Sequence, residues 1–249
     1  MATVILARHG RTSANAGGVL AGRTKGVHLD DLGLEQARAA GGRLAGLPLA
    51  GLVTSPLERC RETAKEINKA QPAPLKPVTE RGIVECDYGS WTGQKIADLS
   101  KDTMWATVQA HPSAAVFPEG EAMADMAARA VAAVRRWDAR IEAEHGPEAV
   151  WVAVSHGDVI KAILADALGL HLDSFQRIVV DPASLSVVRY TPHRPFVVTS
   201  NSTAGDLAHL KPVKPAKPAK QARKRKKAAV SSDAAVGGGA GPAAASPSA

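Results

Sequence analysis

The stretch TVILARHGRTSAN, residues 3–15, places an Arg-His-Gly-Arg cluster directly after a short apolar run. The run at 4–7, Val-Ile-Leu-Ala, has the length and branched composition of a strand buried on both faces. Arginine is rarely buried unless it is paired, so Arg8 and Arg11 on either side of His9 contribute little to ordinary packing. We therefore interpret the cluster as chemistry-bearing residues placed at the end of a strand.

Strand-like and helix-like patterns alternate from this stretch to about residue 200. Strands are predicted at 4–7, 51–55 and 149–155, helices at 29–46, 56–70, 126–145 and 157–169, and an edge hairpin at 184–201. Such alternation predicts an α/β fold, a three-layer α/β/α sandwich around a mostly parallel sheet. Sheets of this kind bind ligands beyond the carboxyl ends of their strands, which is where His9 and His156 fall.

Composition and charge divide the 249 residues into two parts. We expect one domain at 1–203 and a disordered Lys/Pro/Ala-rich tail at 204–249, which lacks the apolar content needed for a core. With only two cysteines, no apolar run of about 20 residues and no signal-peptide pattern, we expect a cytoplasmic protein without a membrane span. The sequence does not predict an oligomeric state.

The basic charge is confined to the tail. Nine Lys and Arg residues and two Asp residues after position 200 account for the whole net charge of +7. Lys-Pro-x triplets followed by RKRKK, within residues 211–227, suit weak contact with a nucleic acid or another anionic surface. A solvated tail without a partner fits the same composition equally well.

Five sequence blocks follow one another along the domain. They are RHG (8–10), SPLERCRETA (55–64), VECDYGSWTG (84–93), PEGE (118–121) and VAVSHGDVIKA (152–162). A tripeptide such as Arg-His-Gly recurs by chance, but the five blocks together are a specific signal. In these blocks, and over roughly residues 3–200, the chain resembles the histidine phosphatase superfamily, the phosphoglycerate-mutase-like group with an Arg-His-Gly signature.

The resemblance and the chemistry of phosphate esters assign roles to the first and last blocks. His9 is the expected nucleophile, since a neutral imidazole can attack phosphorus and form a phosphohistidine. Arg8 and Arg59 are the expected phosphate clamp, because guanidinium groups bind phosphoryl oxygens in a fork. The remaining expected phosphate ligands are Asn15, the Gly157 amide at a helix start, and His156, which would donate to a phosphoryl oxygen if it is cationic.

The resemblance also implies a proton donor. Glu85 matches the family's glutamate and would protonate the leaving oxygen and then deprotonate water. Its neighbour Asp87 is the alternative carboxyl group and is expected to be a solvated loop residue. Candidate substrate contacts are Arg11, Gly22 and Tyr88. We expect no metal ion and no cofactor, because the chain contains none of the common metal-binding or nucleotide-binding motifs.

The sequence favours a phosphatase over a mutase. A mutase of the phosphoglycerate type grips a carboxylate with additional basic residues, whereas residues 94–120 contain only Lys95 and Lys101 and no arginine. We therefore expect hydrolysis of a small phosphorylated substrate. Two alternatives stay open: a phosphoglycerate-type phosphomutase and a catalytically silent sensor of a phosphorylated ligand.

Overall fold

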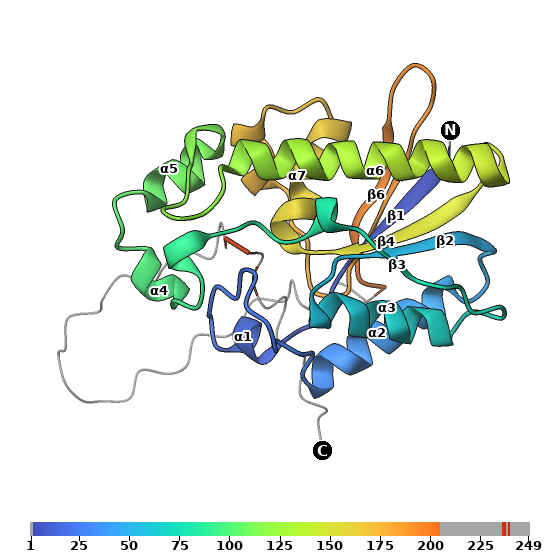
Figure 1. Ribbon diagram of the computed structural model, residues 1–249, viewed down its shortest axis with the longest axis horizontal. Helices are drawn as coiled ribbons and strands as arrows, with labels where there is room; N and C mark the ends of the chain where they lie inside the picture. Colours follow the sequence, from blue (N-terminus) through green and yellow to red (C-terminus); the bar gives the residue numbers. More distant parts are fainter. Residues whose placement is uncertain (1, 205–235, 238, 240–249) are drawn as a thin grey trace, which may run out of the picture.

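The computed structural model describes residues 2–204 together with Val236, Gly237 and Gly239 (Figure 1). The predicted anionic-surface contact at 211–227 lies outside the described residues. Most of the predicted disordered tail at 204–249 lies outside them as well, so both expectations stay predictions. No helix in the described part of the chain has the length and apolar character that a membrane crossing requires.

One mixed sheet of six strands forms the centre of the domain. Its strands, in the spatial order β3-β2-β4-β1-β5-β6, are β3 (Val78–Thr79), β2 (Leu49–Thr54), β4 (Val150–Ser155), β1 (Thr3–Arg8), β5 (Leu185–Arg189) and β6 (Phe196–Ser202). The first four strands of this order run parallel to one another, and β5 runs antiparallel to both of its neighbours, β1 and β6. The predictions of a mostly parallel sheet and of an edge hairpin are confirmed.

Helices cover both faces of the sheet, which confirms the three-layer architecture (Figure 1). The pair α2 (Asp31–Leu44) and α3 (Glu58–Lys69) packs on one face, and α6 (Met123–His145) and α7 (Gly157–Ala167) pack on the other. The remaining helical segments are α1 (Ser13–Ala16), α4 (Ile96–Leu99), α5 (Trp105–Ala110) and the 3-10 turns η1 (Arg81–Ile83), η2 (Gly89–Trp91), η3 (Pro112–Ala114) and η4 (Leu172–Arg177).

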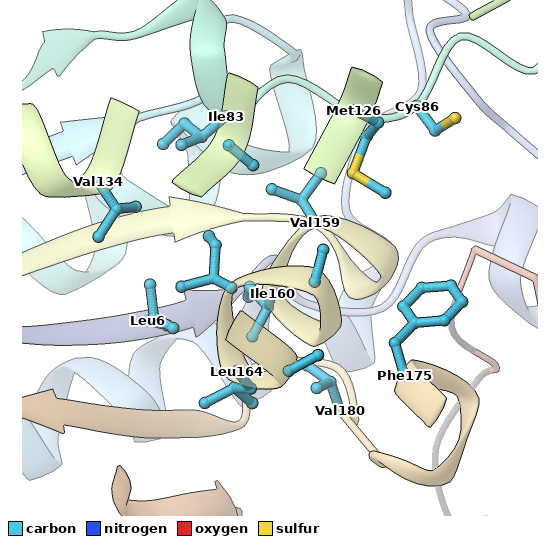
Figure 2. Packing of buried hydrophobic residues seen from close by; sticks show 14 of the residues in the cluster. Leu6, Ile83, Cys86, Met126, Val134, Val159, Ile160, Leu164, Phe175 and Val180 are labelled. Carbon is cyan, nitrogen blue, oxygen red and sulfur yellow. The ribbon is translucent and has the colours of Figure 1, made fainter. Parts of the chain in front are cut away.

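The apolar run of β1 explains why this strand is central. Its side chains alternate between the two faces, so Val4 and Leu6 join the cluster under α6 and α7, whereas Ile5 and Ala7 join the cluster under α2 and α3. Figure 2 shows Leu6 in the first of these clusters, packed among side chains from several elements. A strand with two buried faces reads as a continuous apolar run, which is the pattern in the sequence.

Local signals set some helix ends, whereas α6 begins at Met123, before the predicted 126, without a side-chain cap. Asp30 caps α2 by accepting from the Gly33 amide at 2.8 Å, and Gly146 ends α6 with a φ of 92° that favours glycine. The predicted helix from Pro56 instead begins at Glu58. Ser55 is still paired with the sheet, and the extended Leu57 is the N-cap, so Pro56 precedes the helix.

The topology brings three strand ends to one edge of the sheet. Arg8 at the end of β1 is paired with Ser155 at the end of β4, and the His9 amide donates to the Ser155 carbonyl at 2.9 Å. On the other side of β4, the Ser55 amide after β2 donates to the Val154 carbonyl at 3.0 Å. Residues far apart in the sequence therefore meet at the carboxyl ends of parallel strands.

Candidate active site

His9 lies at the bottom of a pocket at this edge of the sheet. Its side chain is only 3% exposed, and its Nδ1 lies 2.7 Å from the Gly10 carbonyl. A carbonyl oxygen accepts only, so Nδ1 carries the proton and Nε2 keeps its lone pair. Burial, and then the charges of Arg59 and Arg8, hold the pKa of His9 well below its ordinary value. The imidazole is therefore neutral near pH 7.

Arg59, from the first turn of α3, connects the two histidines of the pocket. Its Nε donates to His9 Nε2 at 3.3 Å, and its Nη2 donates to the Gly22 carbonyl at 2.8 Å and to His156 Nδ1 at 3.3 Å. Its Nη1 is buried and has no hydrogen-bond partner among the described residues. A buried guanidinium N–H without a partner is costly, so this atom marks a place for an anionic oxygen.

His156 follows β4 and is the N-cap of α7. Its ring is fully buried and packs edge-on against the His9 ring, with centroids 5.3 Å apart. Because Nδ1 accepts from Arg59, Nε2 carries the proton and donates to Ser55 Oγ at 2.7 Å. Burial and Arg59 lower the pKa of His156 well below its ordinary value. The cationic form is therefore disfavoured in the unliganded site, and the conditional donor role of His156 requires a bound anion to restore it.

Glu85 lies opposite the histidines, on the loop between η1 and η2. The carboxyl group is buried, with Oε1 accepting from the Cys86 amide at 3.0 Å and Oε2 lying 3.9 Å from His156 Nδ1. Burial, followed by the negative charge of Asp158, raises the pKa of Glu85 to about 7. This carboxyl group can therefore release and recover a proton at physiological pH, as an acid–base group must.

Two arginines hold the backbone of Glu85 in place. Arg23 Nε donates to the Glu85 carbonyl at 2.9 Å, and Arg129 Nη2 donates to the same oxygen at 3.1 Å. The Glu121 carboxylate, from the PEGE block, bridges both arginines and accepts from the Asp87 amide at 2.8 Å. Asp87 itself pairs with Arg23 and is 39% exposed. The network fixes the loop and separates the buried Glu85 from the solvated Asp87.

Arg8 is fully buried and is not among the described residues that line the pocket. Its Nη1 donates to the Val180 carbonyl at 2.8 Å and to the Gly239 carbonyl at 2.9 Å, and its Nη2 donates to the Gly237 carbonyl at 3.4 Å. Burial lowers the pKa of Arg8 to about 10, against the raising effect of nearby carboxylates. The guanidinium group is therefore still cationic at neutral pH.

Three of the other expected ligands line the same pocket, and a fourth follows His156 in the chain. Asn15, Gly22 and Tyr88 line it, and Gly157 begins the helix that His156 caps. Asn15 Oδ1 accepts from the amide and hydroxyl of Thr12, which leaves its amide N–H groups for a ligand.

Arg11 pairs with a carboxylate that is outside the pocket lining. Its Nε donates to Asp30 at 2.8 Å, and Arg11 is not among the described residues that line the pocket. Its expected substrate contact receives no support from this geometry.

Sequence reasoning missed several residues that the fold brings to the site. Asp158, fully buried in the first turn of α7, accepts from the Tyr88 hydroxyl at 2.7 Å and influences Glu85. Cys60 Sγ lies 3.4 Å from His156 Nε2, although burial raises the pKa of its thiol to about 12. Asp158 follows the SHG motif directly, and that proximity was the available signal.

Comparison with known proteins gives the class of this chain. The sequence profile of the histidine phosphatase superfamily (branch 1) matches residues 4–203. The chain therefore belongs to the histidine phosphatase superfamily, whose members transfer phosphoryl groups as phosphatases or mutases. Within the described residues, no group of three or more His, Cys, Asp or Glu side chains is placed to hold a metal ion.

Particular relatives include both kinds of enzyme. A probable phosphoglycerate mutase GpmB of Yersinia pestis (strain Pestoides F) is 30% identical over 214 residues, covering 84% of this chain and 95% of the relative. The structure of mycobacterial glucosyl-3-phosphoglycerate phosphatase with VO3 is 25% identical with a TM-score of 0.71, covering 80% of this chain and 99% of that one. An Entamoeba histolytica phosphoserine phosphatase mutant with phosphoserine shares the fold, at 22% identity, 82% and 98% coverage and a TM-score of 0.72.

Proposed function

We propose that this protein is a phosphatase that hydrolyses small phosphate monoesters through a phosphohistidine on His9. The observation that carries the proposal is the pairing of two protonation states in one pocket. His9 presents an unprotonated Nε2, and Glu85 has a pKa raised to about 7. A neutral nucleophile and a protonated acid are the two forms that attack on a phosphate ester requires.

In the first step, His9 Nε2 attacks phosphorus and the bond between phosphorus and the ester oxygen breaks. Glu85 gives its proton to the departing oxygen, so the alcohol leaves neutral and Glu85 becomes a carboxylate. Arg8 and Arg59 balance the charge of the transferring phosphoryl group, and the Nη1 of Arg59 gains the acceptor that it lacks among the described residues.

In the second step, water attacks the phosphohistidine and Glu85 takes its proton. The bond between phosphorus and Nε2 breaks, inorganic phosphate leaves, and both side chains return to their initial states. A bound dianion also favours a proton on His156, because negative charge nearby raises the pKa of an imidazole. His156 and the Gly157 amide are then donors to phosphoryl oxygens.

Hydrolysis is favoured over the mutase alternative by the walls of the pocket. Of residues 94–120, only Ile96 is among the described residues that line it. Lys95 is exposed, and Lys101 is exposed and pairs with Asp98. This segment therefore supplies no second group of cations to hold a substrate carboxylate while a phosphoryl group returns to it.

The proposal is tested by following the fate of the phosphoryl group. Incubation with 3-phosphoglycerate and a bisphosphoglycerate primer, and with a panel of other phosphate esters, should give inorganic phosphate. Rapid formation of 2-phosphoglycerate would instead establish the mutase. A sensor would bind these esters without turning any of them over.

A labelling experiment tests the nucleophile. With a ³²P-labelled ester, rapid quenching at high pH should trap label on His9, and H9A should carry none. H193A is the matched control, because His193 is exposed in the β5–β6 hairpin turn, at the opposite end of the sheet. Label that persists in H9A would overturn the assignment.

A further inference from the structure

Three residues from the far C-terminal part of the chain lie inside the candidate active site. Val236, Gly237 and Gly239 line the same pocket as His9 and Arg59. We call these three residues the glycine segment. The Gly239 and Gly237 carbonyls accept from Arg8 Nη1 and Nη2, and the Gly237 amide donates to Asp158 at 2.9 Å.

The carbonyl contacts use the donors that a phosphoryl group needs. Arg8 is a buried guanidinium whose two terminal nitrogens each donate to an oxygen of the segment. Phosphoryl oxygens bind guanidinium groups in the same forked arrangement. Carbonyl oxygens of the glycine segment and oxygens of a phosphate ester therefore cannot occupy Arg8 together.

The residue types at positions 236 and 237 also suit the pocket. Val236 is 1% exposed and belongs to the same apolar cluster as Leu20 and Tyr88. Gly237 has a φ of +79°, and a Cβ at this position would lie 2.9 Å from Leu20 Cδ1. Position 237 therefore favours glycine both by its backbone conformation and by the space around it.

Little room is left in the pocket beside the segment. The remaining cavity of about 30 Å³ is enough for water molecules, since a single water needs roughly 10–15 Å³ on this measure. A phosphate monoester has at least six non-hydrogen atoms, namely phosphorus, four oxygens and the ester carbon, and does not fit. The catalytic side chains are consequently shielded, with His9 3% and Arg59 2% exposed.

We propose that the pocket is a binding site for the chain's own glycine segment, which competes with the phosphorylated substrate and holds the enzyme in an autoinhibited state. The inference rests on the proposed function, because it identifies the pocket as the place where the substrate's phosphoryl group binds. The 31 residues between Ala204 and Val236 can span up to about 100 Å, so the tether permits both docking and release. Attachment to the same chain gives the segment a high effective concentration at the site.

Two substitutions in the full-length protein release the segment in different ways. V236D places a charge where the structure buries an apolar side chain, and G237V places a branched side chain at a positive φ against Leu20. For p-nitrophenyl phosphate we expect each variant to lower KM by tenfold or more with little change in kcat, as removal of an intramolecular competitor requires. V198D is the matched control, because Val198 is 59% exposed on β6, and it should leave both constants unchanged.

A binding measurement separates this inference from the proposed function. In the H9A background, calorimetry with inorganic phosphate should show at least tenfold tighter binding for H9A/V236D than for H9A alone. If no phosphate ester is turned over by any variant while phosphate binding still tightens, the proposed function fails and the segment's role stands. If wild type and V236D turn over p-nitrophenyl phosphate with the same KM, or V236D has the higher KM, the autoinhibition is refuted while the phosphatase activity stands.

Discussion

Arg59 Nε lies 3.3 Å from His9 Nε2 and donates to it. This contact requires a lone pair on Nε2, so the guanidinium group selects the tautomer of His9 that can attack phosphorus. In the proposed mechanism this contact breaks when Nε2 bonds to phosphorus, which frees an Arg59 N–H for a phosphoryl oxygen at that moment. In that mechanism one side chain therefore holds the nucleophile ready and is positioned to stabilise the group that receives its attack.

Replacement of Arg59 by lysine tests this dual role. We expect R59K to lower kcat/KM by about 10²–10³-fold, because an ammonium group keeps the charge but loses the planar fork that contacts His9 and His156. R61K is the control, since Arg61 is exposed on the same helix. Steady-state kinetics with p-nitrophenyl phosphate measure both, and an R59K enzyme within fivefold of wild type would contradict the assignment.

The raised pKa of Glu85 predicts that catalytic activity falls as the pH rises. Glu85 must be protonated to act as an acid, so kcat/KM should fall as the pH rises through about 7. E85Q should lose about 10²–10⁴-fold in rate at pH 6 and should no longer show this descending limb. D87N should keep the limb, because Asp87 is solvated. A pH–rate profile in which D87N, and not E85Q, loses the limb would exchange the two roles.

The two buried histidines predict acid sensitivity of the fold. Their pKa values are held well below the ordinary value of 6.5, so the stability that they contribute is present above pH 6.5 and is lost as the pH falls below it. At pH 5.5 the loss in the free energy of unfolding is about 1.4 kcal/mol for each histidine. The raised pKa of Glu85 changes the free energy of unfolding in the opposite direction. Urea unfolding at pH 7.5 and 5.5 should therefore show a smaller acid penalty for H156N than for wild type. The exposed-site variant H193N should resemble wild type.

Two glycines of α2 form a matched pair for a stability test. A Cβ on Gly33 would lie 2.0 Å from the carbonyl oxygen of Arg11, two residues after His9. A Cβ on Gly42 would meet nothing within 4 Å. G33A should destabilise the protein by at least about 1–3 kcal/mol, and G42A should stabilise it by about 0.5–1 kcal/mol. Thermal unfolding that gives the two variants the same sign would contradict this packing.

Chelation tests where the positive charge at the site comes from. In the proposed mechanism Arg8 and Arg59 supply it from the protein, so phosphate release should continue unchanged in excess EDTA. Loss of activity in EDTA with recovery on adding Mg²⁺ would contradict this expectation.

Patterns within short windows explain what the sequence predicted well. The continuous apolar runs of β1 and β4 identified central parallel strands, and polar residues immediately after them marked the pocket edge. His9 and His156 were brought together because adjacent parallel strands end at the same edge. Asp30 and Gly146 lie at helix ends through capping, which is a local interaction and so belongs to the same short-window signals.

Interactions that join distant segments through backbone atoms were not predictable. Arg23 and Arg129 contact the Glu85 carbonyl, and a carbonyl is present at every position of the chain, so the sequence carries no signal for this choice. The glycine segment has no hydrophobic period that predicts docking. Its fit depends on the shape of a pocket that only the folded domain creates.

The way in which two arginines hold the Glu85 backbone has a practical consequence. Arg23 and Arg129 hold this position by its main-chain oxygen, not by its carboxyl group. The side chain can therefore be replaced while the loop keeps its conformation. A glutamine at position 85 would leave the binding pocket intact, and the variant would turn over its substrate very slowly. Such a variant could capture the substrate. Immobilised and incubated with cell metabolites, it would retain its natural substrate long enough for identification by mass spectrometry.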